Sequence, residues 1–184
     1  VAAVLISVLL RRSTRHDEPI LYLPLFRDHN FALGSALSFL VAGTFAGTFL
    51  AFVQLMNEGW GLSLLQSGLA VGLIPAIGGP MSVVSGRLAD RFGHRFVILP
   101  GSLAMAAGGA FMYFSVTEER QLVAVWLPFV VYGLGVGFAH AACQAAALSN
   151  VEQSRLGMGS AMNRISQDIG QTVSAAVVIA LLAR

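Results

Sequence analysis

The sequence has few charged residues, no lysine and a single cysteine. Charged side chains make up 11% of the 184 residues, whereas an ordinary soluble domain carries about 25%. A soluble fold of this size could not cover its surface with so few charges, so the composition excludes a water-soluble domain. Hydrophobic residues make up 56% of the chain, and the mean hydropathy is +0.75. In a membrane, lipid takes the place of the missing polar surface.

The other shortages exclude several classes of site. Cys143 is the one cysteine, so the chain can form neither an intrachain disulfide nor a cysteine metal cluster. The sequence contains no phosphate-binding loop, no metal-spaced His/Cys set and no nucleophile arrangement. We therefore expect no enzyme activity, no cofactor and no metal. A net charge of +2 in so apolar a chain is no sign of a nucleic-acid partner.

Five apolar stretches are long enough to cross a bilayer, which takes about 20 residues in a helix. They cover residues 31–56, 64–89, 96–116, 122–148 and a last helix from about 156 to 184. Residues 1–10 are apolar but too short to cross, and we interpret them as the tail of a preceding transmembrane helix. Residues 11–30 are predicted to form a cytoplasmic connector, and residues 31–184 an all-α polytopic membrane bundle that lacks its last helix.

The arginines fall on one side of this topology. Alternating spans put Arg11, Arg12, Arg15, Arg27, Arg87, Arg91, Arg95 and Arg155 on one side, and leave Arg120 between the third and fourth spans on the other. Cytoplasmic loops carry the excess of basic residues in membrane proteins. The turn between the second and third spans is therefore predicted to be cytoplasmic.

Small residues and prolines add expectations about packing. Glycines recur at helical spacing at positions 43 and 47, at 68 and 72, and at 133, 135 and 137, a pattern that lets membrane helices approach closely. Pro75 and Pro80 remove intrahelical hydrogen bonds and are expected to bend the second span.

The cytoplasmic turn reads GRLADRFGHR, from Gly86 to Arg95. It resembles the signature loop of the major facilitator superfamily of transporters, GxLaDRxGxR, at all of that pattern's fixed positions. PLFRDHNFALGSALSFL (24–40), SLLQSGLAVGLIP (63–75) and NVEQSRLGMGSAMNRISQDIGQTVSAA (150–176) look like parts of the C-terminal half of its fourteen-span drug/proton antiporters. Together the resemblance covers nearly the whole chain, and the short connector also favours the fourteen-span arrangement.

The resemblance implies a conformational latch in this loop, formed by Gly86, Asp90, Arg91, Gly93 and Arg95. Its glycine would allow close helix contact and its aspartate would form a charge relay. From the residues alone, Asp90 can also cap a helix N-terminus, because the positive end of a helix dipole favours an anion. A role limited to topology and capping stays open beside the latch.

Other polar residues in the spans could line a substrate or proton pathway. Gln54 matches a position that lines the substrate path in similar transporters. Asn163, Gln167 and Gln171 are four residues apart and share one helix face, and His140 lies four residues before Gln144. Asp168 is the acid most deeply placed in a span, where acids usually face a cavity or a partner. It can act in the pathway or form a structural pair with Arg164, and Asp168 and Gln171 both depart from the family pattern.

The resemblance implies a secondary transporter that works by alternating access, exporting amphipathic compounds or drugs with protons as the coupling ion. An importer or facilitator of the same fold, or a membrane scaffold without transport, remains an alternative. The expected partners are a small-molecule substrate, protons, the lipid bilayer and the missing N-terminal half of the same chain. The expected location is a bacterial cytoplasmic membrane.

Overall fold

The structure, a computed structural model, describes residues 23–115 and 122–183. Its helical elements, in chain order, are η1 (Leu23–Arg27), α2 (His29–Gln54), the π-helical turn η2 (Leu55–Gly59), α3 (Leu64–Val71), α4 (Leu73–Phe92), α5 (Arg95–Ser115), α6 (Leu122–Leu148), η3 (Gln153–Arg155) and α7 (Leu156–Leu182). Five helical segments in this part of the chain are long and apolar enough to cross a membrane. The predicted all-α bundle with five membrane spans is confirmed.

The predicted span bounds agree closely with the helices. α6 has the predicted bounds, and α5 begins and ends one residue before them. α2 begins at His29 because the Asp28 side chain caps it, accepting a hydrogen bond of 2.9 Å from the backbone N–H of Phe31. The predicted tail at 1–10, most of the connector at 11–30 and Arg120 lie outside the described residues.

The second span is divided into α3 and α4 at Gly72. Pro75 has no N–H, so the carbonyl of Val71 has no donor four residues further on. α3 therefore ends at Val71, and Pro75 lies in the first turn of α4, where backbone N–H groups have no helical partner in any case. Pro80 stays inside α4. The distortion that the prolines predict is thus a break at Gly72.

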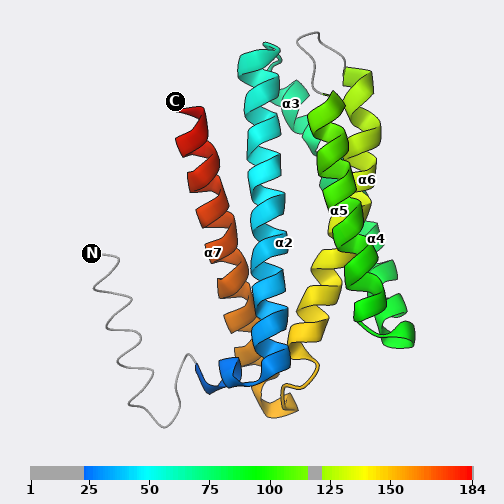
Figure 1. The fold of residues 1–184 in the computed structure, drawn as a ribbon, viewed down its shortest axis with the longest axis vertical. Coiled ribbons are helices and arrows are strands. Elements are labelled where there is room, and N and C mark those ends of the chain that lie inside the picture. The colour runs from blue at the N-terminus through cyan, green and yellow to red at the C-terminus, as the bar shows by residue number, and fades with distance from the viewer. Residues whose placement is uncertain (1–22, 116–121, 184) are drawn as a thin grey trace.

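The helices form two packed groups that share α6 (Figure 1). α2 packs along α7, while α4 and α5 pack on α6. α6 crosses the bundle: its first half lies among α4 and α5 and also contacts α2 through Phe129 and Tyr132, and its last turns reach α2 and α7. α6 is therefore the helix through which the two groups meet.

Glycines make these helix contacts close. A Cβ atom added at Gly43 of α2 would lie 2.9 Å from the carbonyl oxygen of Gly170 in α7, and one at Gly137 of α6 would lie 2.5 Å from that of Gly78 in α4. Such distances leave no room for a side chain. The same holds for the other glycines that pack as predicted, Gly47, Gly133 and Gly135. The prediction was wrong for Gly68, where an added Cβ would meet nothing within 4 Å.

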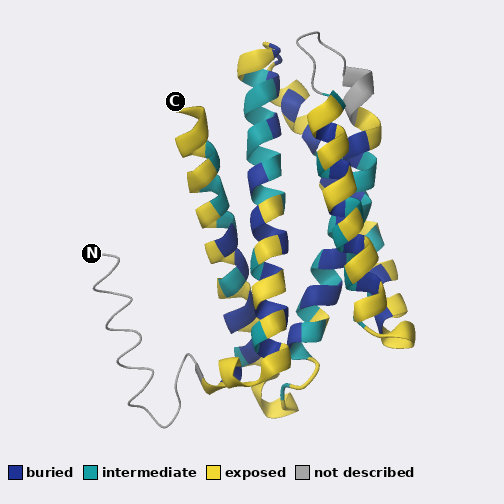
Figure 2. Cartoon of the chain, in the orientation of Figure 1, coloured by how far each residue is buried: buried dark blue, intermediate teal, exposed yellow. Residues whose placement is uncertain are grey.

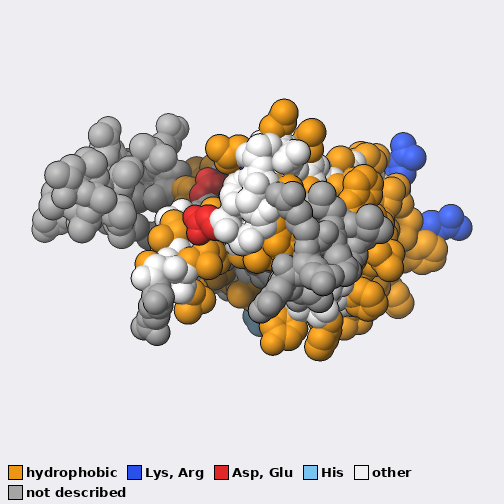
Figure 3. All heavy atoms as spheres, turned by 90° about the horizontal axis from the view of Figure 1, so that it is seen from above, with side chains coloured by type: hydrophobic (Ala, Val, Ile, Leu, Met, Phe, Trp, Pro, Cys, Tyr) orange, Lys and Arg blue, Asp and Glu red, His pale blue; other side chains and the backbone are white. Residues whose placement is uncertain are grey.

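The bundle shows its large apolar side chains on the outside. Leu64, Phe96 and Phe114 are each exposed over more than 75% of their surface. Figure 2 shows exposed positions along the outward faces of the helices, and Figure 3 shows hydrophobic side chains around the outline of the bundle. Lipid tails are the environment that such a surface requires, because water would hydrate it at a high free-energy cost.

The described loop arginines gather at one end of the bundle. Arg27 ends η1, Arg91 and Arg95 flank the turn between α4 and α5, and Arg155 ends η3. Figure 1 places these three segments at the same end. By the positive-inside rule we expect that end to face the cytoplasm, and it is called the cytoplasmic end below. The opposite end is called the outer end below.

Candidate functional site

The turn between α4 and α5 depends on a glycine. Gly93 ends α4 with φ at 90°, a conformation that other residues rarely adopt, and its N–H donates to the carbonyl of Ala89 at 2.8 Å. Asp90 is exposed, and within the described residues its carboxylate has neither a capping hydrogen bond nor an ion pair with Arg91 or Arg95. Arg91 instead lies over the Phe92 ring, 5.4 Å from its centroid. The local partners expected for Asp90 are thus not found there.

Gly86, the first residue of this segment, faces open space. A Cβ atom added at Gly86 would meet nothing within 4 Å. The residue therefore makes no close helix contact inside the described bundle, and its α4 surface is free to contact another element.

A chain of hydrogen-bonded side chains crosses from α6 to α7 and on to α2. The Gln144 amide nitrogen lies 3.3 Å from His140 Nε2 on α6 and donates to Gln167 Oε1 on α7 at 3.3 Å. Gln167 donates to Asn163 Oδ1 at 2.7 Å. Asn163 donates to the hydroxyl oxygens of two serines on α2, Ser35 at 3.3 Å and Ser38 at 3.2 Å. We call these six residues the polar junction.

The two ends of the polar junction differ in exposure. Asn163, Gln167 and both serines are at most 2% exposed, whereas His140 and Gln144 are half-buried. Buried polar groups in a membrane bundle are costly unless they are hydrogen-bonded, and here each buried member has a partner. The buried polar groups of the junction are therefore all hydrogen-bonded, and the junction is partly exposed at its His140 end.

The junction joins three of the predicted pathway residues, His140, Asn163 and Gln167. Ser35 and Ser38 were not predicted, although their i, i+3 spacing on the first span could have indicated a polar stripe. Gln171 is half-buried on the same helix and, among the described residues, takes no part in the junction.

Two predicted residues lie apart from the junction. Asp168 forms an ion pair with Arg164 one turn earlier, with a carboxylate oxygen 3.1 Å from Nε, and both side chains are more than half exposed. The pair that the spacing predicts is therefore present, on the outer surface of α7. Gln54 ends α2 at the outer end of the bundle, 16 residues and so about 24 Å along the helix from Ser38.

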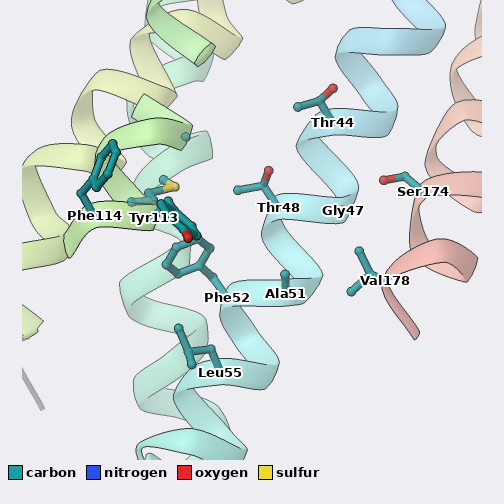
Figure 4. Close-up of a pocket in the computed structure, with 12 residues that line it drawn as sticks. Thr44, Gly47, Thr48, Ala51, Phe52, Leu55, Tyr113, Phe114, Ser174 and Val178 are labelled. Atoms are coloured by element: carbon teal, nitrogen blue, oxygen red, sulfur yellow. The ribbon is translucent and has the colours of Figure 1, made fainter. Parts of the chain in front are cut away.

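A cleft of about 840 Å³ opens in the outer half of the bundle between α2, α5 and α7. Its wall combines small, hydroxyl, aliphatic and aromatic residues: Thr44, Gly47, Thr48, Ala51, Phe52, Leu55, Gly109, Met112, Tyr113, Phe114, Ser174 and Val178. Figure 4 shows Thr44 and Thr48 along α2, between Ser174 of α7 and the aromatic pair of α5. Behind it, the Tyr132 hydroxyl donates to Thr48 at 3.2 Å and ties α6 to α2. We call this space the outer cleft.

No group of three His, Cys, Asp or Glu side chains among residues 23–115 and 122–183 could hold a metal ion. The chemistry of these sites therefore rests on amides, hydroxyls, one ion pair and one histidine.

A family model of the major facilitator superfamily matches residues 1–175. The chain belongs to this superfamily. It is 26% identical over 169 residues to the drug efflux pump JefA of Mycobacterium tuberculosis (strain H37Rv), and 29% identical over 182 residues to the multidrug resistance protein Stp of the same strain. It is also 24% identical over 181 residues to the uncharacterized transporter YhcA of Bacillus subtilis.

These alignments cover 92%, 99% and 97% of the chain but only 33%, 34% and 33% of the relatives. The chain thus spans about a third of the length of the transporters that it matches. Membership of this superfamily makes the chain part of a multi-pass membrane protein, and the turn with Gly86 and Asp90 is the segment that resembles the superfamily's signature loop.

Proposed function

We propose that this chain belongs to the C-terminal half of a secondary transporter that exports amphipathic compounds in exchange for protons. The observation that carries the proposal is the polar junction, which places a half-exposed histidine at the end of a buried hydrogen-bond chain between three membrane helices. Membrane transporters often use intramembrane ionisable residues as ion or proton sites. The names of JefA and Stp, a drug efflux pump and a multidrug resistance protein, support export of drug-like compounds.

Transport would proceed by alternating access, in which two helix bundles rock around a site near the bilayer midplane. In this proposal the described helices are one bundle, and the N-terminal half of the same chain is the other. Gln54, His140, Asn163, Gln167, Asp168 and Gln171 are the residues proposed for the substrate or proton pathway. The setting is the cytoplasmic membrane of a bacterium, and the parent protein has fourteen spans.

The signature loop is proposed to latch the two halves. Gly86 presents a free surface and Asp90 has an exposed carboxylate, as a contact to a second bundle requires. In this proposal Gly93 fixes the turn, while Arg91 and Arg95 complete the charge relay on the cytoplasmic side. Asp90→Asn would therefore keep membrane insertion but change the balance between inward-facing and outward-facing states, measured by accessibility labelling from each side. Unchanged labelling together with normal transport would contradict the latch.

The outer cleft is proposed to hold the membrane span that follows α7. α7 packs on α2 much as α4 packs on α6, but α6 also carries α5, whereas the corresponding side of α2 is the wall of the cleft. A further helix on that side would give both groups the same three-helix arrangement. We therefore assign the cleft to helix packing and not to substrate.

Transport by the full protein in proteoliposomes tests the proposed function. A fluorescent lipophilic cation is loaded inside, and its release is followed with and without a proton gradient across the membrane. Proton-coupled export predicts release that accelerates with the gradient and slows when an ionophore collapses it. Release that ignores the gradient would identify a facilitator, and no release of any amphipathic compound tested would favour a scaffold.

A further inference from the structure

We propose that His140 is a proton-binding site whose protonation reverses the hydrogen-bond direction of the whole polar junction, and so links α6 to the contact between α7 and α2. The inference deepens the proposed function, since it rests on proton coupling and names a site for the proton. It follows from the donor and acceptor roles along the junction.

His140 Nε2 must accept a hydrogen bond in the present arrangement. Its neighbour at 3.3 Å is the amide nitrogen of Gln144, which only donates. Neutral His140 must therefore carry its proton on Nδ1. The second hydrogen of the Gln144 amide goes to Gln167 Oε1, so both hydrogens of this amide are in use.

A protonated imidazole has donors on both ring nitrogens, so it cannot accept from Gln144. The contact becomes favourable again when the Gln144 amide rotates by half a turn and presents its oxygen to Nε2–H. That oxygen then faces Gln167 Oε1, and two acceptors in contact repel each other. Gln167 must rotate as well, which places its oxygen against Asn163 Oδ1, and Asn163 must follow.

The reversal ends at Ser35 and Ser38. Their hydroxyls accept from the Asn163 amide in the present arrangement, and hydroxyls can donate to its oxygen after rotation. The junction therefore has two satisfied states of opposite direction. No proton passes along it: one proton from solvent binds His140 Nε2, and the three amides rotate.

The position of His140 suits a proton site. It is half-buried, while the amides beyond Gln144 are almost completely buried, so this is the more exposed end of the junction in the described bundle. His140 lies eight residues before the cytoplasmic end of α6, or about 12 Å along the helix. Histidine is also the side chain that ordinarily changes charge between about pH 5 and 8.

Few charges face this histidine. From α7 the positive charge of Arg164 acts on it, and Arg164 is itself paired with Asp168. α2 has no titratable residue between His29 and Glu58. The charged residues at the cytoplasmic ends of α4 and α5 are exposed: Arg87, Asp90, Arg91 and Arg95. α6 itself adds two weakly acidic groups, Tyr132 and Cys143.

The connection between α6 and α7 gives the reversal a consequence. Among the described residues, α6 and α7 are joined by the side-chain hydrogen bond from Gln144 to Gln167. The two helices otherwise contact each other little. α7 is held to α2 by close backbone packing and by Asn163. The state of His140 thus acts on the sparse contact between α6 and α7.

Solid-state NMR of the full transporter in lipid bilayers tests the proposal without substrate or gradient. Histidine, glutamine and asparagine side chains are isotope-labelled, and their signals are followed from pH 8 to pH 5. We expect neutral His140 to carry its proton on Nδ1, and the amide signals of Gln167 and Asn163 to move with the same midpoint as His140.

Variants separate the relay from a general pH effect. His140→Gln should abolish the pH-dependent shift of both amides, and Gln144→Leu should abolish it while His140 still titrates. His29→Gln, at an exposed histidine at the start of α2, is the matched control and should leave the shifts unchanged.

Wild-type spectra alone can overturn the inference, so it does not depend on any variant folding. A neutral His140 with its proton on Nε2, or amide signals that stay constant while His140 titrates, would leave the junction as a structural contact only. In that case proton-driven release in proteoliposomes would still support the proposed function. Conversely, a coupled titration without gradient-driven release would keep the inference and remove the proposed function.

Discussion

The polar junction and the outer cleft are two regions between the same helices, α2 and α7, with opposite character. At the cytoplasmic end α7 is bound to α2 by a satisfied chain of amides and serines that leaves no space. At the outer end the two helices still touch through small residues, but their shared side opens toward α5. The contact between α2 and α7 is therefore specified by hydrogen bonds at the cytoplasmic end and by the close fit of small residues at the outer end.

The specificity of these helix contacts is distributed unevenly between the two ends. In lipid no water is released when apolar helices meet, so close packing and interhelical hydrogen bonds decide which helices associate. Both are found at the cytoplasmic end, because Gly34 of α2, one residue before Ser35 of the junction, lies against Ala147 of α6. The cleft has walls of the same kind but an open side, which the further helix proposed above would cover.

The largest expected effect comes from adding a side chain at the tightly packed cytoplasmic end of α2, beside the polar junction. Gly34→Leu would place a Cβ atom 2.5 Å from the Cα of Ala147, and backbone atoms cannot move aside cheaply. We expect a loss of about 3 kcal/mol in stability, at the upper end of the range for overpacking, measured by thermal unfolding of the purified full protein in detergent. The matched control is Gly79→Leu on α4, where an added Cβ meets nothing within 4 Å. Equal stability of the two variants would contradict the close contact at the junction.

Removing the amide at the centre of the junction should cost less. Asn163→Leu keeps the size of the side chain but leaves the Gln167 amide and the two serines without their partner. Interhelical hydrogen bonds in membranes contribute about 0.6 kcal/mol each on average, so losing the two bonds to α2 and the one to Gln167 within α7 predicts about 1 to 2 kcal/mol. Unfolding in a detergent titration measures it.

Gln171→Leu provides the control for this variant, because Gln171 is half-buried on the same helix and makes no hydrogen bond to the junction. Its stability should stay within about 0.5 kcal/mol of the wild type. If both leucine variants lost the same stability, helix polarity in general and not the junction would be responsible.

The hydrogen bond behind the outer cleft tests whether packing alone defines the helix contact at the outer end. Tyr132→Phe removes the bond to Thr48 and leaves the buried ring in place. The expected loss is about 0.6 kcal/mol, less than for Asn163→Leu, because a single bond is removed from a contact that packing already defines. Tyr113→Phe, at an exposed ring on α5, should have no measurable effect. A loss for Tyr132→Phe as large as that for Asn163→Leu would show that hydrogen bonds hold both ends alike.

The spans and the junction differ in how far the sequence could predict them. Span bounds follow from hydropathy along one dimension, so α5 and α6 were predicted to within one residue. The break at Gly72 was predicted only as a bend, because the position at which a proline interrupts a helix depends on which carbonyl loses its donor. The helix bounds therefore needed little beyond the sequence.

The polar junction required contacts between helices. Spacing of four placed Asn163, Gln167 and Gln171 on one face, yet each step of four residues turns 40° past a full circle in a helix of 3.6 residues per turn. Gln171 is therefore rotated about 80° from Asn163 and misses the junction. Ser35 and Ser38 come from a helix more than 120 residues earlier in the chain, and no local pattern connects them with Asn163.

The smallest effect is expected for the ion pair that lies outside both regions. Asp168 and Arg164 are more than half exposed, and exposed pairs contribute about 0.2 to 1 kcal/mol, so Asp168→Asn should cost about 0.5 kcal/mol. The exchanged double variant, Arg164→Asp with Asp168→Arg, should recover most of that loss, as a double-mutant cycle on unfolding would show. If the pair is only structural, the pH dependence of transport in Asp168→Asn should match that of the wild type. A changed pH dependence would instead place Asp168 in the proton pathway. The polar junction would then have a charged neighbour on α7 that takes part in transport.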